Sequence, residues 1–175
     1  DDLNRLSEAY FQFAKRTSDQ QVLEKGVSAL LKLVGKEKEN SSEQSSHYWR
    51  LAESFFLLGE KSGEAVDYFK ALKNFSKASS FFDTEWQFCL LQGICFERLY
   101  GFLNSKDYLY QAKECFEKAF LARPEDHLTT LRLSQCLITL YQIDANPQHF
   151  DRAEDLLHKV IASNTDEADF FFELG

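Results

Sequence analysis

Between Thr84 and Ala122, apolar residues recur every three or four positions in two runs, separated by the polar break GFLNSKD. The first run carries Phe88, Leu91, Cys95, Leu99 and Phe102, and the second carries Leu109, Ala112, Phe116 and Ala119. Such spacing places each set on one face of an α-helix. We expect Thr84 to cap the first helix, Asn104 or Ser105 to cap the second, and Pro124 to follow its end. The pattern therefore predicts a hairpin of two antiparallel helices.

The same pattern returns at an interval of 41 residues. The aligned sets are Ala71/Ala112/Ala153, Phe75/Phe116/Leu157, Ala78/Ala119/Val160 and Ala52/Gly93/Ser134. A fixed interval of this kind indicates a repeat protein in which each helix pair is covered by its neighbours. We expect the first three sets to be buried, and the small residues of the fourth to lie where two helices approach closely.

Turn and cap residues mark the boundaries between stacked units, which together form one domain. We place the units at about 2–34, 45–83, 84–124 and 125–165, with a last, incomplete helix over 166–175. Asn146 and Pro147 form a cap and a first-turn proline inside the fourth unit. The polar segment from Gly35 to His47 is expected to be a longer loop between units. Because the sequence holds no Met and its last helix stops short, we expect it to be a fragment of a longer protein.

The second helix of the third unit resembles a tetratricopeptide repeat (TPR). In AKECFEKAFLARPED, the residues Ala112, Phe116, Ala119 and Pro124 occupy the Ala, aromatic, Ala and Pro positions of that family. The first helix of a TPR carries an aromatic residue or Leu, then Leu, a small residue and an aromatic residue. Three sets match this pattern, the second with one weak member and the third as far as the chain extends: Tyr48/Leu51/Ala52/Phe55, Thr130/Leu133/Ser134/Leu137 and Phe171/Leu174/Gly175. The resemblance implies an all-α, right-handed superhelical solenoid of antiparallel helix hairpins, with about four pairs. The repeat is 41 residues long, whereas the family's usual repeat has about 34.

The resemblance also implies a concave groove lined by one stripe of the first helices. By alignment, the groove residues are Trp49, Glu53, Phe56, Leu57, Leu90, Ile94, Glu97, Arg98, Leu128, Leu131, Gln135, Ile138 and Phe172. Most of these side chains are apolar, and exposed apolar surface commonly marks an interaction site. The alternative is that neighbouring helices, or a part of the protein outside this sequence, already cover them.

Composition and charge narrow the classes of partner. A net charge of −8 repels nucleic-acid backbones and anionic membrane surfaces, and no apolar run is long enough to span a bilayer. Four cysteines, Cys89, Cys95, Cys115 and Cys136, show no metal-site spacing, so we expect buried reduced thiols and a cytoplasmic protein. No cofactor or oligomeric state is indicated.

Catalytic and metal-binding motifs are missing from the sequence. The four histidines, at 47, 127, 149 and 158, form neither HExxH nor an i,i+4 pair, and no nucleophile or phosphate-binding signature is present. We therefore expect no enzyme but a protein–protein interaction scaffold that binds a partner segment in the groove. Two alternatives stay open: a secretion-type chaperone that holds an apolar client segment, and the arm of a larger protein whose activity lies elsewhere. The carboxylate clamp of chaperone-binding TPR proteins is not expected, because Arg98 is the only cation among the groove residues.

Overall fold

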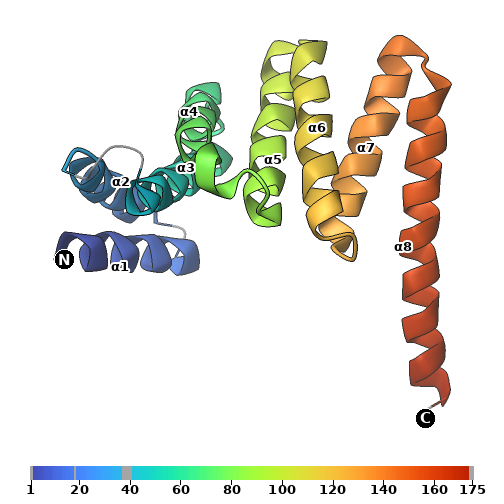
Figure 1. Cartoon of the computed structure of the whole chain (residues 1–175), viewed down its shortest axis with the longest axis horizontal. Coiled ribbons are helices and arrows are strands. Elements are labelled where there is room, and N and C mark those ends of the chain that lie inside the picture. Colours follow the sequence, from blue (N-terminus) through green and yellow to red (C-terminus); the bar gives the residue numbers. More distant parts are fainter. Residues whose placement is uncertain (1, 18, 37–40, 174–175) are drawn as a thin grey trace.

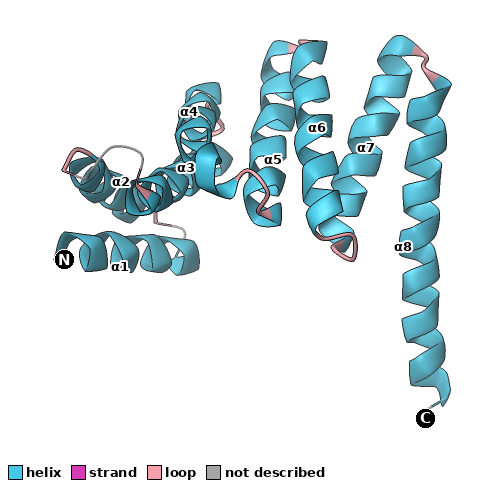
Figure 2. Ribbon diagram, in the orientation of Figure 1, coloured by secondary structure: helices cyan, strands magenta, loops and turns pink. Residues whose placement is uncertain are grey.

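The computed structural model describes residues 2–17, 19–36 and 41–173, with their side chains through residue 162. These residues form eight helices and no strand (Figures 1 and 2). The helices are α1 (Asp2–Thr17), α2 (Gln20–Val34), α3 (Ser42–Ser62), α4 (Ala65–Phe82), α5 (Trp86–Leu103), α6 (Lys106–Ala122), α7 (His127–Asp144) and α8 (Pro147–Glu173).

Successive helices pack against one another in chain order. The pairs α1–α2, α3–α4, α5–α6 and α7–α8 form hairpins, and each hairpin packs on the next through α2–α3, α4–α5 and α6–α7. Figure 1 shows the hairpins in a row from the N-terminus to the C-terminus, with α8 reaching well beyond the end of α7. The all-α fold of consecutive helix hairpins that the sequence predicts is confirmed.

The repeat register correctly predicts the core in the middle of the array. Six predicted core side chains are fully buried: Ala71, Phe75, Ala78, Ala112, Phe116 and Ala119. In the last hairpin Ala153 and Leu156 are buried, but Leu157 and Val160 are only partly covered, so their predicted burial is wrong. Among the described helices, α7 is the one that packs extensively against α8. The side of α8 that carries Leu157 and Val160 is left partly open.

Two glycines on first helices allow the second helix of the same hairpin to come close. A Cβ atom at Gly93 would lie 2.5 Å from Cε1 of Phe116, and one at Gly59 would lie 2.9 Å from Cζ of Tyr68. Real Cβ atoms do not tolerate such distances, because carbon atoms in contact lie about 3.5–4.0 Å apart. The predicted close approach at Gly93 is therefore confirmed.

The connection before α3 is shorter than the sequence predicts. The hydroxyl oxygen of Ser41 accepts a hydrogen bond from the backbone N–H of Gln44 at 3.0 Å, and the helix begins at Ser42. The expected loop from Gly35 to His47 is thus wrong in its second half. Ser45 and His47 are buried within α3, and Nε2 of His47 lies 3.2 Å from Oδ1 of Asn4 on α1. Packing on α1 therefore outweighs the polar character of this segment.

Helix boundaries in the later units agree with the sequence in part. α8 begins at Pro147, and Oδ1 of Asn146 accepts a hydrogen bond from the N–H of Gln148 at 3.1 Å, as the cap prediction requires. The residue before α5 is Glu85 rather than the predicted Thr84. α8 also continues without a break to Glu173, so the predicted helix start near Asp166 is wrong. Residues 161–167 hold neither Gly nor Pro, and the polar residues there disfavour a helix interior by less than about 1 kcal/mol each.

Candidate functional site

The first helices of the four hairpins, α1, α3, α5 and α7, are joined to one another by ion pairs; we call the surface that they share the first-helix face. Arg50 on α3 reaches Glu8 on α1 at 3.0 Å. Glu60 on α3 accepts two hydrogen bonds from Arg98 on α5, at 2.7 and 3.0 Å. Arg132 on α7 donates to Glu97 on α5 at 3.0 Å. These contacts fix the spacing of the first helices along the array.

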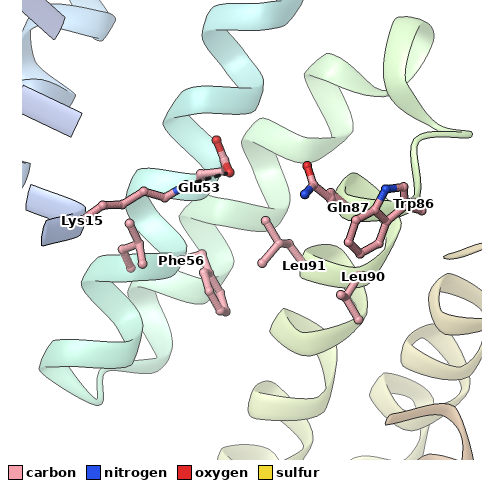
Figure 3. Close-up of a pocket in the computed structure, with 8 residues that line it drawn as sticks. Lys15, Glu53, Phe56, Trp86, Gln87, Leu90 and Leu91 are labelled. Atoms are coloured by element: carbon pink, nitrogen blue, oxygen red, sulfur yellow. Dashed lines mark ion pairs between the residues drawn. The ribbon is translucent and has the colours of Figure 1, made fainter. Parts of the chain in front are cut away.

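A pocket opens on this face between α1, α3 and α5 (Figure 3). Its volume is about 300 Å³. The lining residues are Lys15 from α1, Glu53, Phe56 and Leu57 from α3, and Trp86, Gln87, Leu90 and Leu91 from α5. Apolar side chains thus provide most of the wall, while Lys15, Glu53 and Gln87 supply the polar groups. A largely apolar cavity with a few polar groups is the usual form of a binding site.

Trp86 forms one end of the pocket, at the first turn of α5. The guanidinium carbon of Arg123 lies 4.7 Å from the centre of its ring. A cation held over an indole at this distance is attracted by the ring's electron density. The contact favours this orientation of the indole at the end of the pocket.

The pocket also contains a weakly paired acid. Nζ of Lys15 lies 3.8 Å from Oε1 of Glu53, at the long end of the range for an ion pair. Burial raises the pKa of the Glu53 carboxyl above its ordinary value, despite the opposing charge of Lys15. By contrast, the hydrogen bonds from Arg98 lower the pKa of Glu60. Burial also raises the pKa of Glu97, although Arg132 lies 3.0 Å from it. Glu53 therefore stands apart by its long distance to Lys15 rather than by its pKa.

The structure brings four of the predicted groove residues together in this pocket: Glu53, Phe56, Leu57 and Leu90. Glu97 and Arg98 lie on the same face of the array, where each is engaged in an ion pair. On α7, the side chains of Leu128, Leu131 and Gln135 are exposed and that of Ile138 is half-buried. The side chain of Phe172 lies outside the described residues.

Two predicted groove residues are covered in different degrees: Ile94 is buried in the core, and Trp49 is half-buried against the edge of the core. The Trp49 ring is tilted against Phe82, with ring centres 4.6 Å apart, and meets Phe88 edge-on at 5.8 Å. Ile94 is 7% exposed within the main core cluster. α5 packs against both α4 and α3, and Trp49 is covered from these neighbours by Phe82 of α4 and Phe88 of α5. For these residues, the alternative that neighbouring helices cover the stripe is correct.

Four residues that line the pocket are not among the groove residues predicted from the sequence: Lys15, Trp86, Gln87 and Leu91. Lys15 belongs to the least regular unit, where the repeat could not be aligned. Trp86 and Gln87 stand in the first turn of α5, before the aligned stripe begins. Leu91 was assigned to the buried face of its helix, yet it also reaches the pocket. The one sequence feature that could have indicated the pocket was Trp86, a large apolar side chain in the first turn of a helix.

Other kinds of site are not evident in the part of the chain that the structure describes. No three His, Cys, Asp or Glu side chains are grouped there so as to hold a metal ion. All four cysteines are buried free thiols, and burial raises the pKa of each. No described helix is both long and apolar enough to cross a membrane.

Comparisons with known proteins add little to this geometry. No family model matches the chain, and no curated protein sequence matches it. Among solved structures, the chain is similar to "DHF58 filament", with 15% identity and a TM-score of 0.44 over 99% of this chain and 96% of that one. It is also similar to "DHF79 filament", with 16% identity and a TM-score of 0.38 over 90% of this chain and 95% of that one. At these scores neither similarity assigns the chain to a family or to a function.

Proposed function

We propose that this chain is a protein–protein interaction scaffold that binds a segment of a partner protein on its first-helix face. The observation that carries the proposal is the pocket between α1, α3 and α5, which is walled by Phe56, Leu57, Trp86 and neighbouring leucines. An apolar side chain of a partner would remove this wall from water, at a gain of roughly 25 cal/mol per Å² of apolar surface buried. Helical repeat proteins offer extended surfaces for such binding.

The tetratricopeptide resemblance supports the same role. The buried Ala112, Phe116 and Ala119, and the contact of Gly93 with Phe116, follow the packing that this resemblance implies. We propose a TPR-like, right-handed superhelix with long repeats on this basis. The role is binding rather than catalysis, and the four free thiols favour a cytoplasmic location.

A matched pair of pocket-filling substitutions tests the proposal. Gln87 and Gln111 are both exposed, but only Gln87 lines the pocket. Gln87→Trp should fill part of the pocket, while Gln111→Trp adds the same side chain on α6, a second helix. Partners recovered with the wild-type chain and identified by mass spectrometry should be lost with Gln87→Trp and kept with Gln111→Trp. Equal recovery with both variants would place the binding surface elsewhere.

The exposed apolar residues of α7 favour a second candidate function. Leu128 and Leu131 are 49% and 42% exposed. A chaperone for apolar client segments would use such a surface without a defined pocket. The chain would then suppress aggregation of an unfolded client, as measured by light scattering, and Leu131→Glu would reduce this effect more than Gln87→Trp. The opposite ranking of the two variants favours the scaffold. The role of an arm within a larger protein is compatible with either function.

A further inference from the structure

Glu53 differs from the other carboxylates of the first-helix face in how it is paired. Glu60 and Glu97 each accept a guanidinium hydrogen bond of 3.0 Å or less. The ion pair of Glu53 with Lys15 has a distance of 3.8 Å, and its side chain is only 23% exposed. A carboxylate that is largely withdrawn from water needs close partners to offset the lost hydration. Glu53 therefore presents unused hydrogen-bond acceptors to the pocket.

Neither nearby cation completes the pairing of Glu53. Lys15 is 46% exposed, and its Nζ also lies 4.7 Å from the centre of the Phe11 ring, which attracts it. Arg50 is held by Glu8 at 3.0 Å and by Oδ1 of Asn4 at 3.1 Å. A cation supplied from outside the chain can thus reach Glu53 without displacing a short ion pair.

The remaining pocket walls suit the stem of a long side chain. Phe56 and Leu91 face the same cavity as Glu53 (Figure 3), and Leu57 also lines it. The volume of about 300 Å³ corresponds to roughly ten water molecules at about 30 Å³ each, which is room for one long side chain. The amide of Gln87 has no hydrogen bond to another described residue, and Figure 3 shows it on the same side of the pocket as the Glu53 carboxylate. Its carbonyl oxygen is a second acceptor for a cationic donor.

We propose that the pocket recognises an arginine or lysine side chain of the partner segment, with its apolar stem along Phe56, Leu57 and Leu91 and its cationic head on Glu53. Arg and Lys are the side chains that combine a long apolar stem with a charged end. The net charge of −8 on the whole chain attracts such a basic segment. This inference rests on the proposed function, because it names the chemistry that the same pocket selects.

The burial of Glu53 predicts how its replacement changes the stability of the free protein. Burial raises the pKa of its carboxyl, so the ionised form is less stable in the folded chain than in water. This unfavourable effect on folding appears as the pH rises above about 4.5, the ordinary value. Glu53→Gln should therefore keep or raise the melting temperature at pH 7, while removing the acceptor for the cation.

Three small probes with one stem and different heads test the proposal: n-hexylammonium, n-hexanol and hexanoate. The chain has two tryptophans, so its NMR spectrum contains two indole N–H signals. Trp86 lines the pocket, whereas Trp49 does not line it, packs half-buried against the core and serves as an internal control. We expect hexylammonium to shift the Trp86 signal with a dissociation constant on the order of 10 mM for so small a ligand. Hexanol should bind at least threefold more weakly, and hexanoate more weakly still.

Two variants distinguish the preference for a cationic head group from the binding of the apolar stem in the pocket. Glu53→Gln should erase the advantage of hexylammonium over hexanol and leave hexanol binding intact. Glu114→Gln, which removes one charge from an exposed position on α6, should preserve the advantage. Equal binding of hexylammonium and hexanol to the wild type, or a large drop in melting temperature with Glu53→Gln, overturns the cation preference but leaves an apolar pocket. If no probe shifts the Trp86 signal, both the inference and the proposed pocket function are wrong.

Discussion

Replacing Gly93 with alanine tests the packing of the repeat more sharply than a large truncation would. The new methyl carbon would lie 2.5 Å from Cε1 and 2.6 Å from Cδ1 of Phe116. Two carbon atoms in contact need about 3.5 Å, so the ring must move by about 1 Å. Phe116 is fully buried in a densely packed core, and overpacking of this kind destabilises by about 1–3 kcal/mol.

Gly101 in the same helix provides the matched control, because a Cβ atom there has no neighbour within 4 Å. Alanine in place of glycine within a helix ordinarily stabilises by about 1 kcal/mol. Gly101→Ala should therefore stabilise the protein by about 0.5–1 kcal/mol. At Gly93, the cost of overpacking against Phe116 should exceed the gain in helix propensity. The net loss of stability should be about 1–2 kcal/mol.

Urea unfolding followed by circular dichroism at 222 nm measures both variants. In a thermal melt of the same variants, the melting temperatures should differ by roughly 3–12 °C, since about 1 kcal/mol shifts a chain of this size by about 2–4 °C. Phe116→Leu should be less destabilising in the Gly93→Ala background than in the wild type, because the two residues are coupled. If Gly93→Ala and Gly101→Ala stabilise equally, the contact between α5 and α6 is misplaced and the repeat register is wrong.

Three further predictions concern the core, the α7 surface and pH. Phe116→Ala should destabilise by about 3–5 kcal/mol in urea unfolding, and a change near zero would mean that Phe116 is not a core residue. Leu131→Glu should alter stability by about 0.5 kcal/mol or less, since Leu131 is 42% exposed. If α7 contributes to the partner site, the same variant should weaken binding roughly thirtyfold by titration calorimetry. Because Arg98 lowers the pKa of Glu60, the pair's contribution is complete above about pH 4.5 and is lost as the pH falls below it. Between pH 5 and 3 the wild type should thus lose more stability than Glu60→Gln, and parallel curves would contradict this assignment.

Periodicity predicted the helices and the buried seam because both depend on local spacing. Phe75 and Phe116 recur at the repeat interval, and each is fully buried. The helix ends were harder to predict, since they depend on tertiary contacts. Ser45 and His47 look like polar loop residues, but both are buried within α3, where His47 contacts Asn4 of α1.

The candidate site could be predicted only in part, because contacts between helices of different hairpins decide which first-helix residues are covered. Glu53 and Phe56 line the pocket, whereas Ile94 belongs to the same aligned stripe and lies in the core. The sequence does not reveal that α3 and α5 touch. Nor does it reveal that Lys15, from an irregular first unit, reaches Glu53 across the pocket.

The binding role of the pocket is tested most directly by selecting peptides from a random display library on the immobilised wild-type chain. Each enriched peptide is then titrated against the wild type, Gln87→Trp and Gln111→Trp by fluorescence anisotropy. We predict enriched peptides that share a lysine or arginine beside apolar residues. They should bind Gln87→Trp at least tenfold more weakly than the wild type and bind Gln111→Trp unchanged. Peptides that bind all three proteins equally would contradict the assignment of the pocket between α1, α3 and α5 as the partner site.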